Sequence, residues 1–336
     1  PREPIMTLRR RTFLMTSMAA LAAPSLITAA GAQSGWPQRG RPLKVIVPWP
    51  AGAANDALGR LIADRLQQKF GVASVTENRV GGAGLLGTRA VVQADPDGYT
   101  LLASAFNTAV MPLVLKAAAD FNPETDLEVL GRTAVAPLVC VMSASLPQKT
   151  LAEVIAAAKA EPSKWNFAIS SLGSAGHLAT IDFLRRAGVN IQMVPYRGTQ
   201  PALQDIMGGN VQLLIDPSFA LLPAALDGSR VRALGIATKE RSVLAPSVPT
   251  MAEAGMPGFE FQSWYGIWAP KNLPADIADQ ISALIQETMS DPEVVQRLRA
   301  TLIEPISESR EATKAFIRSD IARATELLRL VNFQPS

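Results

Sequence analysis

The fold of this chain is constrained most by residues 45–65, which combine a β-branched run, two prolines and a helical apolar pattern. Residues 45–47 are consecutive β-branched side chains, and such a run predicts a buried strand. Pro48 and Pro50 end this strand, because proline has no N–H to donate to a neighbouring strand. Apolar residues then recur at helical spacing from Leu58 onward. The stretch therefore predicts a strand, a loop and a helix, which is the repeating unit of an α/β fold.

The turn inside this stretch has the composition of an anion-binding site. Residues 51–54 are alanine and glycine, so a ligand can approach the backbone, and Asn55 or Asp56 is the expected N-cap of the helix. The free N–H groups of a helix start and the positive end of its dipole favour a negative charge. We therefore predict that a carboxylate binds here, although the same turn also suits an ordinary α/β domain.

Two later loops have the same character. The loops at 170–177 and 196–202 each follow a predicted strand and open a helix, and the first of them is rich in serine and glycine. Hydroxyl and N–H groups at a helix start favour a carboxylate. Residues 104–108 and Asp216 also follow strands, and open α/β sheets bind their ligands at the carboxyl ends of strands. Loops from both halves of the chain thus predict a clamped anion.

The first 32 residues have the pattern of an export leader. Three arginines at 9–11 precede an apolar stretch at 13–30, and a small-x-small cleavage site follows at 30–32. The same arginines resemble a twin-arginine signal, which leaves the export route open between two pathways. Removal of the leader takes away four arginines and one glutamate and brings the formal net charge from +3 to zero. We expect a periplasmic protein, cleaved near Ala32, with no nucleic-acid partner.

Residues for catalysis or metal binding are scarce. His177 is the only histidine and Cys140 the only cysteine; the loop beside His177 lacks the G-x-S-x-G elbow of a hydrolase, and one histidine cannot form a multi-histidine metal site. Gly82, Gly84 and Gly87 match the dinucleotide pattern G-x-G-x-x-G, but the acidic residue expected about 20 positions later is absent. We expect no catalytic residue, metal or cofactor. We interpret Cys140 as a core residue, and His177 as a residue that orients its loop or contacts the ligand.

Several short motifs follow one another along the chain: P-W-P-A-G at 48–52 with Asp56, E-N-R at 77–79 with the glycines of 82–87, D-P-D-G-Y-T-L-L at 95–102, G-S-A-G-H at 173–177, P-Y-R-G at 195–198, P-T at 249–250 with E-A-G at 253–255, and W-Y-G at 264–266. In order and spacing the chain resembles the extracytoplasmic solute-binding proteins of tripartite tricarboxylate transporters, the Bug family, from the leader to about Val331. The resemblance implies an α/β fold of the two-lobed, type II periplasmic-binding-protein kind, with a ligand cleft between the lobes. Lobe 1 is expected at 43–138 plus 265–336, and lobe 2 at 139–264.

The resemblance also implies a function. Such a protein captures a small organic carboxylate (a di- or tricarboxylate, an amino acid or an aromatic acid) and delivers it to the membrane permease subunits of the transporter. We expect a monomer that is not an enzyme; the alternative is an exported α/β hydrolase or dehydrogenase acting on a small carboxylate. The family usually has two adjacent glycines where this chain has Gly52 and Ala53, so the ligand can differ from common family ligands. The residues expected at the ligand are Trp49, Pro50, Ala51, Gly52, Ala53, Asn55, Asp56, Ser104, Asn107, Thr108, Ser170, Ser171, Gly173, Ser174, His177, Tyr196, Arg197, Gly198 and Asp216.

Overall fold

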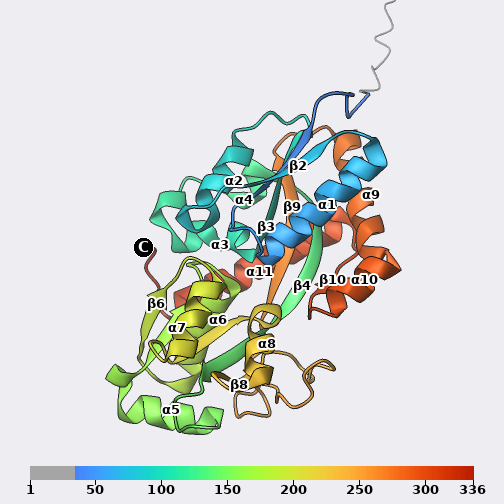
Figure 1. The fold of residues 1–336 in the computed structure, drawn as a ribbon. Helices are drawn as coiled ribbons and strands as arrows, with labels where there is room; N and C mark the ends of the chain where they lie inside the picture. The colour runs from blue at the N-terminus through green and yellow to red at the C-terminus, as the bar shows by residue number, and fades with distance from the viewer. Residues whose placement is uncertain (1–34) are drawn as a thin grey trace, which may run out of the picture. The chain divides into compact units, whose positions relative to one another are not determined.

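The computed structural model describes residues 35–336, so the predicted leader at 1–32 lies outside the described residues. Strands and helices alternate along most of the described chain, as the sequence pattern predicts (Figure 1). The elements are β1 (Leu43–Val47), α1 (Ala54–Phe70), β2 (Ser74–Asn78), η1 (Gly82–Gly84), α2 (Leu85–Val92), β3 (Thr100–Ala105), α3 (Phe106–Val114), η2 (Lys116–Ala118), α4 (Pro123–Asp126), β4 (Leu127–Ser143), α5 (Leu151–Ala160), η3 (Pro162–Lys164), β5 (Asn166–Ile169), α6 (Ala175–Ala187), β6 (Gln192–Pro195), α7 (Thr199–Gly208), β7 (Leu213–Pro217), α8 (Ser218–Asp227), β8 (Val231–Ile236), β9 (Gln262–Pro270), α9 (Ala275–Ser290), α10 (Pro292–Arg299), β10 (Glu304–Pro305) and α11 (Arg310–Leu330).

The first sheet has the strand order β2-β1-β3-β9-β4, and the short strand β10 pairs with β4. Strand β1 is parallel to β2 and β3, whereas β9 runs antiparallel to β3 and β4. Val45 and Val47 of β1 pack with residues of α1 and α9, while Ile46 packs on the other face with residues of α2 and α3. Helices cover both faces of the sheet, so residues 45–47 are all apolar and do not alternate with polar residues.

Strand β4 is long enough to belong to two sheets. Its residues 127–137 pair with β9, and its residues 138–142 pair with β7. The second sheet has the order β4-β7-β5-β6, with β8 also paired to β4. The change of partner falls beside the lobe boundary predicted at 138. The residue bounds of the two lobes stay a prediction, because residues 36–336 form one compact unit.

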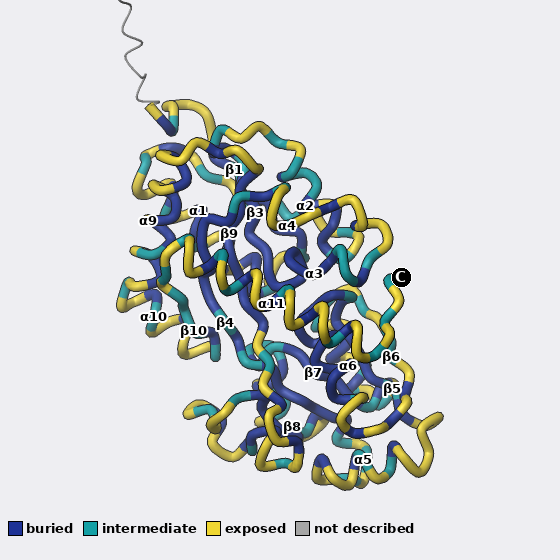
Figure 2. Tube along the Cα trace, turned by 180° about the vertical axis from the view of Figure 1, so that it is seen from behind, coloured by how far each residue is buried: buried dark blue, intermediate teal, exposed yellow. Residues whose placement is uncertain are grey.

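Helices cover both faces of the second sheet as well. Val139 and Val141 pack with residues of α7 and α8, whereas Cys140 packs on the other face with residues of α5 and α6. Figure 2 shows the buried strands between helices whose outer faces are exposed. Cys140 is a core residue, as predicted, and its burial raises the pKa of the thiol to about 12.

None of the helices within residues 35–336 combines the length and the apolar character that crossing a bilayer requires.

The C-terminal helix α11 and the residues just before it form hydrogen bonds with two strands of the first sheet. The guanidinium of Arg132 on β4 donates hydrogen bonds of 2.7 and 2.8 Å to the carboxylate of Glu308, just before the helix. The indole N–H of Trp264 on β9 donates a hydrogen bond of 2.7 Å to Asp320 in the helix. The N–H of Arg132 also donates a hydrogen bond of 3.3 Å to the hydroxyl of Thr313 in α11. These contacts join α11 and the residues before it to β4, which continues into the second sheet, and to β9.

Two local expectations need correction, and one helix was not expected. The N-cap of α1 is Ala53, so the prediction of Asn55 or Asp56 as N-cap is wrong. Ser104 and Asp216 do not follow their strands but lie within the carboxyl ends of β3 and β7, and the rest of residues 104–108 ends β3 and begins α3. Helix α8 is not predicted by the sequence pattern, because Pro223 lies inside it and interrupts the helical signal.

Candidate ligand-binding site

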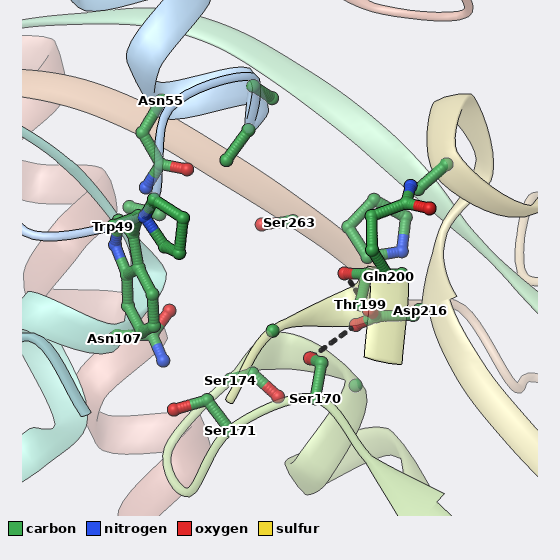
Figure 3. Close-up of a pocket in the computed structure, with 18 of the residues that line it drawn as sticks. Trp49, Asn55, Asn107, Ser170, Ser171, Ser174, Thr199, Gln200, Asp216 and Ser263 are labelled. Atoms are coloured by element: carbon green, nitrogen blue, oxygen red, sulfur yellow. Dashed lines mark hydrogen bonds between the residues drawn. The ribbon is translucent and has the colours of Figure 1, made fainter. Parts of the chain in front are cut away.

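A cavity of about 450 Å³ lies at the carboxyl ends of strands from both sheets (Figure 3). The segments after β1 and β3 line it from the first sheet, and the segments after β5, β6 and β7 line it from the second. This is the edge at which open α/β sheets bind ligands. The lining residues are Trp49, Pro50, Ala51, Gly52, Ala53, Ala54, Asn55, Ala105, Asn107, Ser170, Ser171, Ser174, Ala175, Gly176, Arg197, Gly198, Thr199, Gln200, Pro201, Asp216, Pro217, Phe219, Ala220, Ser263 and Tyr265.

Among the described helices, five begin at this cavity: α1, α3, α6, α7 and α8 each contribute first-turn residues to its lining. Four of these helix starts, those of α1, α3, α7 and α8, have no side-chain cap. Only α6 has one, where Ser174 accepts a hydrogen bond of 3.0 Å from the N–H of His177. Uncapped helix starts leave N–H donors without intrahelical partners, and together with the helix dipoles they attract an anion.

The loop after β1 is held in place by Asp56. One oxygen of this carboxylate accepts hydrogen bonds of 3.0 Å from the N–H of Gly52 and from Nε of Arg60, and the other accepts one of 2.9 Å from Asn78. Burial alone would raise the pKa of Asp56, but the hydrogen bonds from Arg60, Gly52 and Asn78 outweigh it and lower the pKa. Asp56 is not among the residues that line the cavity. It positions the loop that does.

The glycine run after β2 also shapes this loop. A Cβ added to Gly84 would lie 3.4 Å from the Trp49 ring, and one added to Gly87 would lie 2.8 Å from Cβ of Pro48. The absence of a side chain at Gly87 thus lets α2 approach Pro48 closely. This packing explains Gly87 of the G-x-G-x-x-G pattern, and the positive φ angles of Gly82 and Gly84, 56° and 97°, explain the other two glycines.

The loop after β5 is organised by His177. The imidazole is fully buried, its Nδ1 accepts a hydrogen bond of 3.1 Å from the N–H of Gly173, and its ring lies edge-on to Phe333. Burial lowers the pKa of His177 to about 4, so the ring is neutral at neutral pH. His177 is not a lining residue. Of the two roles predicted for it, the structure favours loop orientation.

Asp216 lies at the end of β7 and is the buried charge of the site. Its side chain is 1% exposed, one carboxylate oxygen accepts a hydrogen bond of 2.9 Å from the hydroxyl of Ser170, and the other accepts one from the hydroxyl of Thr199 (Figure 3). Burial raises the pKa of Asp216 to about 6, against the opposing effect of these two hydrogen bonds. The other charged side chain in the lining is Arg197, which is exposed and forms no ion pair within residues 35–336.

Most of the residues predicted at the ligand are brought together by the fold. The predicted residues that line the cavity are Trp49, Pro50, Ala51, Gly52, Ala53, Asn55, Asn107, Ser170, Ser171, Ser174, Arg197, Gly198 and Asp216. A single binding site requires that these residues lie close together, and the structure places them around one cavity. That each of them contacts the ligand stays a prediction.

Six predicted residues do not line the cavity: Asp56, Ser104, Thr108, Gly173, His177 and Tyr196. Each has a neighbour in the protein instead. The hydroxyl of Thr108 donates a hydrogen bond of 2.7 Å to that of Ser104, and the phenol of Tyr196 donates one of 2.7 Å to Asp205. These side chains therefore support the walls of the cavity and do not face it.

The lining also contains residues that sequence reasoning did not single out. Phe219 belongs to α8, whose helical signal is interrupted by a proline. Ser263 and Tyr265 belong to β9, the strand that contains the W-Y-G motif of residues 264–266. Residues two apart on a strand share a face, so the alternation of β9 was the available signal. Within residues 35–336, no three His, Cys, Asp or Glu side chains gather in a way that could hold a metal ion.

The fold and the site together define a class of protein, a two-lobed α/β solute-binding protein of the type II periplasmic kind, with its cavity lined by helix starts. The particular family follows from comparison with known proteins. The family model described as "Tripartite tricarboxylate transporter family receptor" matches residues 58–333, so the chain belongs to that family.

Individual relatives agree with this assignment. Protein BugT of Bordetella pertussis is 35% identical over 290 residues, which are 86% of this chain and 89% of BugT. The structure of the periplasmic binding protein BugD has a TM-score of 0.81 and 28% identity, and the match covers 89% of this chain and all of BugD. The structure of R. palustris Rpa4515 with adipate has a TM-score of 0.83 and 30% identity, and the match covers 90% of this chain and all of Rpa4515.

The predicted family, fold class and function are confirmed: this chain is a solute-binding receptor for small carboxylates of the tripartite tricarboxylate transporter type. The family and these neighbours are binding proteins. They give no support to the alternative of an exported hydrolase or dehydrogenase.

Proposed function

We propose that this chain is exported to the periplasm with cleavage near Ala32, captures a small organic carboxylate in the cavity described above, and presents it to a membrane permease. It does so as a monomer and without enzyme activity. The observation that carries the proposal is the convergence of five helix starts, four of them without a side-chain cap, on one cavity. The similar protein Rpa4515, solved with adipate, supports the chemical class of the ligand.

The ligand carboxylate is held by main-chain and neutral side-chain donors. The first turn of α1 offers free N–H groups. Ser171 offers a hydroxyl that now donates a hydrogen bond of 3.3 Å to the carbonyl oxygen of Leu172 and turns to the ligand on binding. The Nδ2 atom of Asn107 is buried and has no hydrogen-bond partner among the described residues, so it is a donor that a ligand oxygen can satisfy. Hydrogen bonds to a charged group contribute about 1.5–3 kcal/mol each. Three or four of them supply much of the roughly 8 kcal/mol of micromolar affinity, less the costs of association.

Capture is completed by closure of the two lobes, residues 43–138 with 265–336 and residues 139–264. Strands β4 and β9 connect them and bend between an open and a closed state. The ligand shifts the equilibrium toward the closed state only if it binds that state more tightly than the open one. Contacts from both lobes to one small anion provide this difference in affinity.

The proposal is tested by removing one N–H from the cavity. Ala54 is the first residue of α1, and its N-cap Ala53 has φ −72° and ψ 162°, a conformation that proline tolerates in the residue before it. Ala54→Pro therefore deletes a donor and leaves the helix intact. We expect it to weaken carboxylate binding about tenfold in isothermal titration calorimetry, the loss of one charge-assisted hydrogen bond.

The matched control is Ala275→Pro at the first residue of α9. The N-cap of this helix, Pro274, has φ −51° and ψ 135°, which also suits a following proline, and α9 does not begin at the cavity. We expect its affinity to equal that of the unaltered protein. Equal affinity in both variants would reject the helix-start mode of binding. Conversion of any bound acid to a product, detected by mass spectrometry, would reject the role as a pure binding protein.

A further inference from the structure

The cavity contains a cluster of hydrogen-bond acceptors at the end of β7. Asp216 is 1% exposed and lines the cavity, as do Ser170 and Thr199, which both donate their hydroxyl protons to it. Figure 3 shows the three side chains together on the second-sheet side of the cavity, opposite Trp49 and Asn55. Because both hydroxyl protons are directed to the carboxylate, the oxygens of Ser170 and Thr199 are left with lone pairs only.

Within the described part of the chain, no cation neutralises this cluster. Asp216 forms no ion pair with any residue of 35–336, and the first turns of α6, α7 and α8 contain no basic side chain that bonds to it. Arg197 lines the same cavity but is exposed, and it forms no ion pair with residues 35–336. The titratable side chain that faces Asp216 from β9 is Tyr265, whose pKa is raised chiefly by its own burial, so it stays neutral. An ionised buried acid that has hydrogen-bond donors but no positively charged partner is costly unless a cation pairs with it.

A ligand with carboxylates alone fits this cavity poorly. A carboxylate near Asp216 meets a like charge at neutral pH, because the raised pKa of Asp216, about 6, still leaves it mostly ionised there. An ammonium group carries three donors and one positive charge. It matches the three acceptors of Asp216, Ser170 and Thr199 in number and in charge.

We propose that the ligand is an aminocarboxylate, whose ammonium group binds Asp216, Ser170 and Thr199 while its carboxylate binds the helix starts. This inference rests on the proposed function and names the chemical class within it. Asp216 thus selects an amino acid against the corresponding acid without the amino group.

The test compares pairs of acids that differ only in the amino group, titrated into the purified full chain at pH 7.5 by calorimetry. The pairs are aspartate and succinate, glutamate and glutarate, 2-aminoadipate and adipate, and phenylalanine and 3-phenylpropionate. In the pair with the best-bound member we expect the amino acid to bind at least tenfold more tightly. A simple acid that binds as tightly as its amino counterpart would overturn the inference and leave carboxylate binding intact. Failure of every acid to bind at millimolar concentration would overturn the proposed function, and the inference with it.

Asp216→Asn separates selection from simple damage. The variant keeps the shape of the side chain and removes its charge, so we expect the affinity for the amino acid to fall at least tenfold and that for the simple acid to stay equal or rise. A merely structural role would weaken both. Asp227→Asn is the control, because it removes the same charge from the protein at a residue that is exposed at the far end of α8.

Thr199→Val is the second variant, used if Asp216→Asn does not fold. It removes one acceptor and should also lower the preference for the amino acid. Unchanged preference in the folded variants would refute the assignment of Asp216.

Discussion

The first turn of α6 is pressed against the end of β7, and Gly176 is the residue at the contact. A Cβ built on Gly176 would lie 2.2 Å from the carbonyl oxygen of Ile215 and 2.8 Å from Oδ1 of Asp216. Both distances are shorter than a carbon–oxygen contact allows, and the nearer atom belongs to the backbone of a buried strand. Gly176→Ala must therefore displace the helix start or the strand.

The size of the effect follows from two opposing contributions. Alanine is favoured over glycine inside a helix by about 1 kcal/mol. Forcing an extra carbon into a packed interior costs about 1–3 kcal/mol, and a backbone atom yields less readily than the end of a side chain. The contact at 2.2 Å places Gly176→Ala near the upper end of that range. We expect a net loss of about 1–2 kcal/mol in the free energy of unfolding, together with weaker ligand binding, because the shift moves Asp216.

The measurement is urea-induced unfolding of the ligand-free protein, with Gly208→Ala as the matched control. Gly208 also lies in a helix, α7, and the nearest atom to an added Cβ is Nδ2 of Asn210 at 3.4 Å, an ordinary contact. We expect Gly208→Ala to be neutral or to stabilise the protein by up to about 1 kcal/mol. If Gly176→Ala unfolds at the same urea concentration as this control, the close packing of α6 on β7 is wrong.

Two further predictions concern buried groups that titrate. Burial lowers the pKa of His177 from 6.5 to about 4. Between these two pH values the unfolded chain binds a proton at this residue and the folded chain does not, so the free energy of unfolding decreases by up to about 3 kcal/mol as pH falls from about 6.5 to 4. Unfolding free energies of the unaltered protein and His177→Asn should diverge over that interval, whereas parallel curves would contradict the buried neutral ring. Burial raises the pKa of Asp216 from 3.8 to about 6, so the folded protein loses stability as pH rises through that interval and the buried carboxyl ionises. Asp216→Asn should therefore stabilise the ligand-free protein by up to about 3 kcal/mol at pH 7.5 but little at pH 4. Thermal unfolding at both pH values checks this, and equal shifts at the two would count against a buried ionised carboxylate.

Local patterns in the sequence were sufficient to predict the elements that surround the site. The β-branched run of β1 and the helical spacing after it concern residues that are neighbours along the chain, so they predict a βα unit without knowledge of the rest. The same holds for the serine- and glycine-rich turn before α6. Most of the residues around the cavity were predicted for this reason, because the carboxyl ends of strands and the helix starts beside them are visible in sequence.

The direction of each side chain within those turns was decided by tertiary contacts. Asp56 faces Asn78 of β2, a partner that no spacing within α1 reveals, and so it supports the loop and does not line the cavity. Tyr265 reaches the cavity because the register of β9 pairs it with Ala105 of β3. The convergence of five helix starts depends on β4, whose change of partners brings the two sheets together. Periodicity tells which positions are buried; only the packing of strands distant in sequence decides what each of them faces.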